Sequence, residues 1–227
     1  MKGSIDRARV LGSPHIGTYV VVTDNIALVP KGAEEELKRK IRDVLSVSDI
    51  VETTIAGTSL IGIFAVAHGK LVLVPDIVRE EEVEGLRGLG LRVEILETSN
   101  FNALGNVILH NSRALLAHPE LDKDLVARIA SFFGLSTYAR GAIANIPTVG
   151  SAAVVTDRGG LVHPASTSED LRGLGELFGV EFDTGTVNFG IGFIRSGLIA
   201  NNYGVLVGEL TTGPEIVRVT KALRVGE

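Results

Sequence analysis

The chain has 227 residues, of which 45% are hydrophobic, and its mean hydropathy of +0.30 reflects enough apolar material for a substantial core. A net charge of −5 disfavours DNA or RNA as the main partner, because proteins that neutralise several phosphates usually carry a basic surface. The chain contains no cysteine, which excludes disulfides, thiolate metal sites and thiol nucleophiles.

Membrane insertion and secretion are also disfavoured by the sequence. No apolar run approaches the ~18 residues that a membrane-spanning helix needs. Residues 1–20 include Arg7 and Arg9, where a signal peptide would be apolar. We therefore expect a cytoplasmic protein with no membrane partner.

Five similar segments follow one another at a spacing of 42 to 45 residues. Each opens on a glycine and closes on a proline or, in the last copy, on a glycine. The leading residues are Gly17, Gly62, Gly105, Gly150 and Gly192, and the closing residues are Pro30, Pro75, Pro119, Pro164 and Gly208. A fixed period in this range indicates one supersecondary unit used repeatedly, with each copy burying its apolar face on its neighbours.

Each copy begins with a predicted β-hairpin. Apolar, β-branched runs flank a turn signal about seven residues after the leading glycine, where Gly, Asn and Asp tolerate the positive φ of tight hairpin turns. In chain order the turn signals lie at 24–25, 69–70, 111–112, 157–160 and 201–204.

An amphipathic helix and a third strand follow each hairpin. The apolar spacing predicts helices around 37–45, 83–89, 121–129, 171–177 and 216–223, and third strands at 50–57, 91–98, 136–144 and 179–187. The acidic clusters at 34–36 and 80–82 lie near helix N-termini, where negative charge is favourable, so we interpret them as solvated helix starts.

The fifth copy lacks a third strand, because the sequence ends after its helix. Residues 4–12 precede Gly17 as residues 50–57 precede Gly62, which predicts that the N-terminal strand completes the last repeat. An open array would leave unpaired sheet edges, so we expect a closed ring. The predicted fold is an α/β ring of five pseudo-symmetric β-β-α-β repeats, with helices outside and short strands near a central channel.

Such a ring forms a single domain over 1–227. Its repeats are expected at 13–57, 58–101, 102–146 and 147–188, with the last made of 189–227 and 1–12. This arrangement resembles the pentein superfamily, or α/β propellers, whose guanidine-modifying enzymes use a cysteine nucleophile in the channel. Without cysteine, a serine would need a dedicated base to replace it.

The histidines do not supply a metal site by their spacing. They are His15, His68, His110, His118 and His163, and no HExxH or HxxxH pattern occurs among them. We expect no enzymatic activity, no metal and no cofactor.

Asparagines near the predicted strand starts are less easily explained. Asn106 follows Gly105 directly, and Asn188 lies in the segment GTVNFG. Two interpretations stay open: local bonding to the backbone, and a set of polar groups available to a partner.

Three segments resemble the translation initiation factor 6 family of ribosome anti-association factors: NALGNVILHNSRALLAHPELD at 102–122, GGLVHPASTSEDL at 159–171 and GTVNFGIGFIRSGLIANN at 185–202. The resemblance implies a pentein ring without enzymatic activity that binds the large ribosomal subunit. It further implies a contact with a ribosomal protein of the L14 type near the sarcin-ricin loop, which blocks the face that the small subunit must meet.

The resemblance also implies where contact occurs: at strand starts and hairpin turns of the middle repeats, with Asn106 matching a contact position. Ile63 and Gly69 stand where eukaryotic members often carry arginine, and Ser112 stands where they carry an acidic residue. The candidate ribosome-binding residues are Ile63, Gly69, Gly105, Asn106, Asn111, Ser112, Ser151 and Asn188.

We therefore expect a monomer that sterically prevents subunit association, with large-subunit maturation as a further role. Two alternatives stay open. One is a pentein-fold enzyme acting on guanidine compounds, and the other is a repeat scaffold that binds a non-ribosomal protein.

Overall fold

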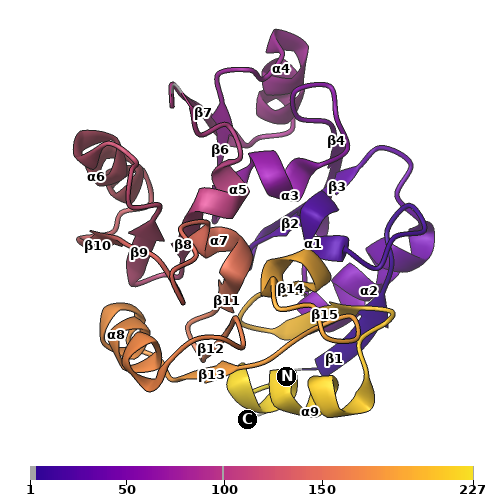
Figure 1. Ribbon diagram of the computed structural model, residues 1–227. Coiled ribbons are helices and arrows are strands. Elements are labelled where there is room, and N and C mark those ends of the chain that lie inside the picture. Colours follow the sequence, from indigo (N-terminus) through magenta and orange to yellow (C-terminus); the bar gives the residue numbers. More distant parts are fainter. Residues whose placement is uncertain (1–3, 99, 227) are drawn as a thin grey trace.

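The computed structural model describes residues 4–98 and 100–226 and has the predicted ring architecture (Figure 1). Five three-stranded sheets surround a central axis, and each follows the same order of an inner, a middle and an outer strand. The inner and middle strands are antiparallel, whereas the middle and outer strands are parallel.

The strands of each class occupy equivalent places in the five repeats. The inner strands are β2 (Val21–Val22), β5 (Val66–His68), β8 (Ile108–His110), β11 (Ala153–Val155) and β14 (Leu198–Ala200). The middle strands are β3 (Ile26–Pro30), β6 (Leu71–Pro75), β9 (Ala114–Ala117), β12 (Gly160–Val162) and β15 (Gly204–Gly208). The outer strands are β4 (Asp49–Thr53), β7 (Arg92–Leu96), β10 (Thr137–Arg140), β13 (Phe182–Thr184) and β1 (Ser4–Ala8).

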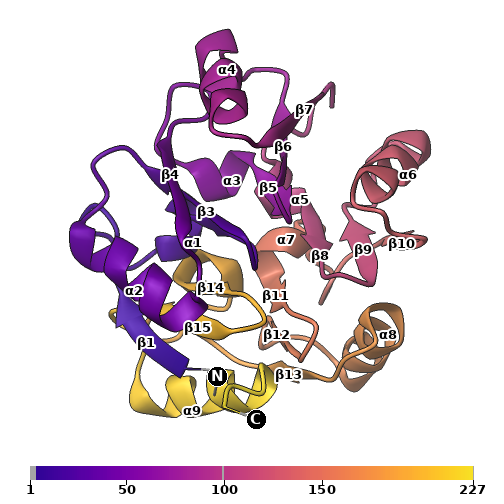
Figure 2. The ribbon, with the colours of Figure 1, turned by 180° about the vertical axis from the view of Figure 1, so that it is seen from behind.

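The N-terminal strand closes the ring, as predicted. β1 pairs in parallel with β15, from Ser4 opposite Gly204 to Ala8 opposite Gly208. Figure 2 shows β1 beside β15, although these strands come from opposite ends of the chain. Closure therefore covers an edge of β15 that an open array would leave unpaired.

Five long helices form the outer layer of the ring (Figure 1). They are α2 (Glu35–Leu45), α4 (Glu80–Gly88), α6 (Lys123–Phe132), α8 (Ser168–Phe178) and α9 (Gly213–Ala222). Their apolar faces join neighbouring repeats: Leu37 and Ile41 of α2 pack in one cluster with Leu206 of β15. Burial of these faces therefore stabilises the contacts between repeats as well as each repeat itself.

The outer strands end earlier than the sequence predicted, because the residues after them form a tight turn. In repeat one, β4 stops at Thr53, and a bridge between Ile55 and Thr58 encloses Ala56 and Gly57 at φ of 53° and 72°. We call these segments the entry turns, and equivalent ones lie at 10–13, 143–146 and 187–191. Left-handed backbone of this kind favours glycine or asparagine.

Three glutamates near the starts of long helices hold entry turns in place. Glu34 accepts hydrogen bonds from the backbone N–H groups of Leu11 and Gly12, at 3.0 and 3.1 Å. Glu82 accepts one from Gly57, and its side chain is buried. The interpretation of both acidic clusters as solvated helix starts is therefore wrong for Glu82 and incomplete for Glu34.

The third of these glutamates, Glu215, is the most heavily bonded. Its carboxylate accepts hydrogen bonds from the Thr186 and Thr212 hydroxyls and from the backbone N–H groups of Phe189, Gly190 and Thr212, at 2.7 to 3.2 Å. Burial alone would raise the pKa of Glu215, but these donors together lower it from 4.5 to about 2.

A Glu215→Gln variant should lose stability in a pH-dependent way. The amide offers one acceptor oxygen where the carboxylate offers two, so we expect a loss of about 2 kcal/mol near neutral pH. Because the folded-state pKa is depressed, this contribution is present above about pH 5 and is lost as pH falls toward about 2. Urea unfolding between these pH values measures it. Glu81→Gln, at an exposed position of α4, is the control; an equal loss in both variants, or a loss unchanged at low pH, would contradict this assignment.

Five short helices, absent from the sequence prediction, precede the inner strands and meet around the axis. They are α1 (Ile16–Tyr19), α3 (Ile61–Phe64), α5 (Leu104–Val107), α7 (Val149–Ala152) and the 3-10 turn η1 (Ile194–Gly197). We call this ring of short helices the collar. Each member contacts the next, and Figure 1 shows α1, α3, α5 and α7 gathered near the centre.

Glycine at the second position of these helices allows the close approach. A Cβ on Gly62 would lie 2.1 Å from the carbonyl oxygen of Gly17, and one on Gly105 would lie 2.0 Å from that of Gly62. A Cβ on Gly150 would likewise meet the Gly105 oxygen at 2.3 Å. The leading glycines therefore mark backbone contacts between repeats.

The fifth leading residue is Arg195, and the assignment of Gly192 to this position was wrong. A Cβ on Gly17 would lie 1.7 Å from the carbonyl oxygen of Arg195. The last entry turn is one residue longer than the others, with Val187 bridged to Ile191. Arginine stands where the other four repeats carry glycine, so a search for a leading glycine selects Gly192, three residues too early. With Arg195 in place the spacings become 45, 43, 45 and 45 residues.

Two glycine substitutions should have opposite effects on stability. Gly105→Ala forces a Cβ against backbone that cannot move without shifting α3, so we expect a loss of roughly 3 kcal/mol. In contrast, Gly173→Ala on the exposed face of α8 meets open space and should gain roughly 0.5–1 kcal/mol. Thermal or urea unfolding of both variants tests this, and a tolerated Gly105→Ala would contradict the collar packing.

Candidate functional site

The ring presents two different ends along its axis. Each inner strand runs from a short helix at one end to a hairpin turn at the other, so the collar closes one end and the turns surround the opposite end. Between them lies a cavity of about 260 Å³, lined by all five inner strands and by the turn residues. Candidate residues therefore divide according to the end on which they lie.

One position of the collar faces outward in every repeat. It follows the leading residue of each short helix and is partly exposed in all five copies: Thr18, Ile63, Asn106, Ser151 and Ser196. We call these five residues the collar face. Three of the candidate ribosome-binding residues, Ile63, Asn106 and Ser151, belong to it and are thus brought together by the fold.

Within the collar face, the hydroxyl side chains are already occupied. Thr18 donates to the His15 carbonyl at 2.6 Å, Ser151 to the Thr148 carbonyl at 2.8 Å, and Ser196 to the Phe193 carbonyl at 2.8 Å. These bonds to the residue three positions earlier explain why hydroxyl residues suit this position.

Asn106 departs from this pattern. Within residues 4–98 and 100–226 its side-chain amide has no hydrogen-bond partner, although the residue is only partly exposed. Its neighbour Gly105 is buried in the collar contact and offers no side chain. Asn106 is therefore the polar group of the collar face that remains available to a partner.

Asn111, in contrast, serves the fold. Its side chain is buried, accepts from the backbone N–H groups of Arg113 and Ala114, and donates to the carbonyls of Thr156 and Phe178. Asn201 makes the same four kinds of bond in repeat five. An asparagine directly before a tight turn is a sequence signal for this role.

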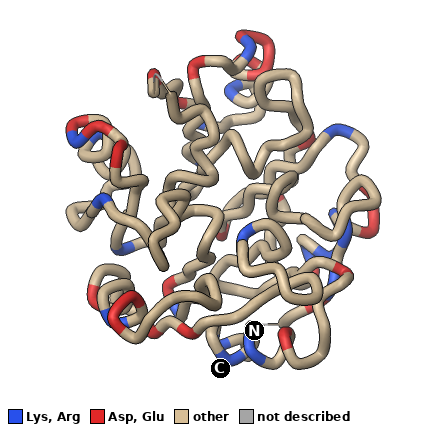
Figure 3. The backbone as a smooth tube through the Cα atoms, in the orientation of Figure 1, with Lys and Arg blue, Asp and Glu red and all other residues tan. Residues whose placement is uncertain are grey.

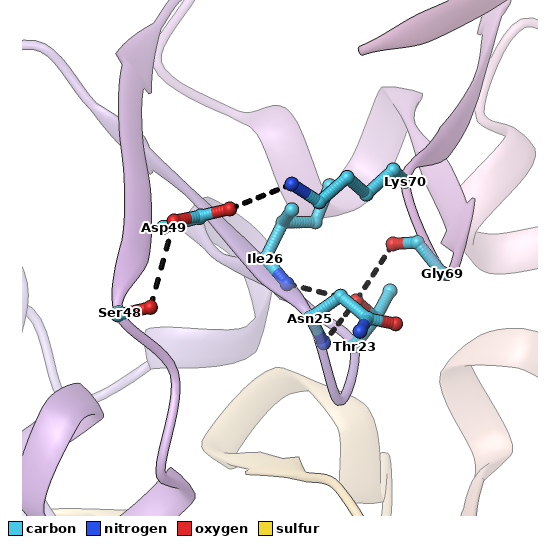
Figure 4. A network of polar contacts seen from close by, with 7 residues as sticks. All are labelled: Thr23, Asn25, Ile26, Ser48, Asp49, Gly69 and Lys70. Atoms are coloured by element: carbon cyan, nitrogen blue, oxygen red, sulfur yellow. Dashed lines mark hydrogen bonds and ion pairs between the residues drawn. The ribbon is translucent and has the colours of Figure 1, made fainter. Parts of the chain in front are cut away.

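Gly69 and Ser112 lie at the hairpin-turn end, opposite the collar face. Gly69 has φ of 58°, and its carbonyl accepts from the Thr23 hydroxyl at 2.9 Å, as Figure 4 shows. The Ser112 N–H donates to the Asp157 carboxylate at 3.0 Å. These two residues therefore cannot share one flat contact surface with Asn106.

Asn188 is a buried residue of the last entry turn. Its amide donates to the carbonyl of Pro14 at 2.8 Å, which connects the last entry turn to repeat one, and its backbone N–H donates to the Thr211 hydroxyl. The residue adopts φ of 47°, which asparagine tolerates better than most residues. Asn188 thus follows the local-bonding interpretation.

The hairpin turns form a polar ring that the sequence did not reveal. Asn202 donates from its backbone and its amide to Asp24, at 2.9 and 2.7 Å, and from its amide to Asp157 at 2.9 Å. With the bond from Ser112 to Asp157, these side chains enclose much of the cavity mouth. We call them the turn ring.

Two histidines and an arginine line the cavity inside the turn ring. Burial lowers the pKa of His68, and burial together with His68 and Arg195 lowers that of His110 to about 3. Burial also lowers the pKa of Arg195, to about 10, so this side chain stays cationic at neutral pH. The described part of the chain contains no cluster of three or more His, Asp or Glu residues that could hold a metal ion.

Charge lies mainly on the outer layer of the ring. In Figure 3 most acidic and basic residues gather on the long helices, whereas the central region is largely uncharged. At the tips of two entry turns, Leu11 and Phe189 expose 45% and 82% of their surface. Among the described residues, no helix is long and apolar enough to cross a membrane.

Comparisons with solved structures give distant matches. A DDAH from Pseudomonas aeruginosa complexed with citrulline aligns over 75% of this chain and 68% of that chain, with 14% identity and a TM-score of 0.47. A dimethylarginine dimethylaminohydrolase adduct with S-methyl-L-thiocitrulline aligns over 80% and 69%, with 14% identity and a TM-score of 0.49.

Proteins related to this chain by sequence are much more similar to it than these structures are. Translation initiation factor 6 of Sulfolobus acidocaldarius is 40% identical over 220 residues, which cover 96% of this chain and 98% of that protein. The same factor of Staphylothermus marinus is 40% identical over 98% of both chains. That of Pyrococcus abyssi is 39% identical over 96% of this chain and 98% of its own length.

The family assignment follows from coverage as well as identity. A model described as the eIF-6 family matches residues 5–222, which include the collar, all five inner strands and the long helices. The resemblance predicted from the sequence is thereby confirmed, and the chain belongs to the eIF-6 family.

Proposed function

We propose that this protein binds the large ribosomal subunit through its collar face and sterically prevents the small subunit from joining. Its relatives are named translation initiation factor 6, which supports a non-enzymatic role in translation. The observation that carries the choice of surface is the unpartnered amide of Asn106 on a rigid collar.

Rigidity favours the collar as a docking surface. Its backbones contact one another directly at Gly62, Gly105 and Gly150, so little conformational entropy remains to be lost on binding. The surrounding entry turns add apolar area at Leu11 and Phe189. A specific contact of at least roughly 1,000 Å² in total needs this wider surface around the five collar-face residues.

The partner that fits is a basic ribosomal protein of the L14 type near the sarcin-ricin loop. The net charge of −5 attracts such a protein at long range, although the charged side chains lie mainly on the outer helices. Charge therefore speeds the encounter, while the uncharged collar face supplies the specific contact. The protein acts as a cytoplasmic monomer. By binding the large subunit it also takes part in the maturation of that subunit.

Asn106→Ser should weaken binding to large subunits without changing the melting temperature. The serine hydroxyl can bond back to the backbone as its counterparts in the other repeats do, which removes the free amide. We expect roughly tenfold weaker binding in co-sedimentation with purified large subunits, equivalent to about 1.4 kcal/mol.

The matched control is Asn25→Ser, an exposed asparagine at the hairpin-turn end. It should pellet with large subunits as the unchanged protein does. Equal binding by the unchanged protein and Asn106→Ser, or equal weakening by both variants, would contradict docking through the collar face. Failure of the unchanged protein to pellet at low salt would overturn the proposed function.

Salt should slow association more than it changes dissociation. Screening shortens the range of charge interactions from ~30 Å at 0.01 M to ~10 Å at 0.1 M salt, so the attraction by net charge is lost first. Stopped-flow mixing with labelled large subunits separates the two rates. A dissociation rate that rises steeply with salt, at a constant association rate, would instead place charged contacts inside the interface.

A further inference from the structure

The cavity on the ring axis contains a positive charge with no counter-ion. Arg195 lines it, and no carboxylate among the described residues lies within ion-pair distance of this guanidinium. Arg195 is partly exposed, whereas its Nε atom is inaccessible to solvent and has no hydrogen-bond partner among the described residues. An unpaired charge in such a place is costly unless a second group compensates it.

A second buried polar atom beside the cavity also lacks a hydrogen-bond partner. The Nδ1 atom of His110 is buried and has no partner in the described structure, and His110 interacts electrostatically with Arg195. Most buried polar atoms in folded proteins are bonded to protein or to an ordered molecule. Arg195 and His110 therefore form a polar part of the cavity wall whose hydrogen-bonding capacity is not fully used within the described residues.

The fixed charges define which guest fits. His68 and His110 are neutral near neutral pH, so Arg195 provides the positive charge of the interior. Asp24 and Asp157 stand at the mouth, where the turn ring binds their carboxylates. A compact anion can satisfy the guanidinium inside, whereas an extended polyanion such as a nucleotide would place charge against the two aspartates.

We propose that the axial cavity is a binding site for a small oxyanion, held by the guanidinium of Arg195. Guanidinium N–H groups match the oxygen spacing of carboxylates and phosphates. The cavity of about 260 Å³ has room for such an anion and several waters, each of which occupies ~30 Å³ in the liquid. The site lies within the ring, away from the collar face, and is independent of ribosome binding.

Titration calorimetry with sodium acetate and sodium phosphate, against chloride at equal ionic strength, tests the proposal. We expect saturable 1:1 binding of at least one of the two, and the one that binds identifies the carboxylate or the phosphate as the chemistry required. Arg195→Gln should reduce that affinity at least tenfold, because the amide is neutral. Arg172→Gln, at an exposed position of α8, should leave it unchanged.

The difference in melting temperature between Arg195→Gln and the unchanged protein should change sign when the binding anion replaces chloride. In chloride, Arg195→Gln should melt at or above the temperature of the unchanged protein, because an uncompensated buried charge is gone. In the binding anion, the unchanged protein should melt higher, because the anion binds only the folded state. Absence of saturable binding of both anions, or equal affinity in Arg195→Gln, would overturn the site.

A crystal of the unchanged protein soaked in the binding anion covers the case in which Arg195→Gln does not fold. Density within hydrogen-bond distance of the Arg195 guanidinium is expected. Density only on the outer surface would overturn the proposal, since it would mark an adventitious ion only.

Discussion

The contact between backbones in the collar is the constraint on which the rest of the structure depends. Because Gly62, Gly105 and Gly150 carry no Cβ, each short helix lies directly against the carbonyl of its neighbour. This spacing fixes how near the axis the inner strands run, and therefore the size of the cavity between them. Closure by β1 then makes the contacts continuous around the ring.

Most residues near the axis have the same role in all five repeats. The proposed functions depend on the residues that differ between repeats. At the outward position of the collar, hydroxyl side chains bond back to their own helix in three repeats, but Asn106 does not. At the preceding position, four repeats carry glycine and the fifth carries Arg195, whose guanidinium lines the cavity and stays cationic at neutral pH. The same five-fold frame thus presents a docking surface outside and a charged cavity inside.

Much of the fold could be predicted from the sequence, because the repeat period, the hairpin turns and the N-terminal closure are local patterns repeated in phase. The short helices could not be predicted, because a single helical turn that contains Gly17 or Gly62 has the same sequence pattern as the start of a β-branched strand. The leading residue of repeat five could not be found by searching for glycine, because Arg195 occupies that position. For the site, spacing alone could not distinguish the free amide of Asn106 from the buried amides of Asn111 and Asn188, because that difference depends on tertiary hydrogen bonds.

The most direct test of docking through the collar is a cryo-electron microscopy map of the protein on the large ribosomal subunit. Our account predicts that α3, α5 and α7 face the subunit, with Asn106 inside the contact and the turn ring exposed to solvent. A map in which the hairpin turns around Gly69 and Ser112 make the contact, with the collar facing outward, would contradict it.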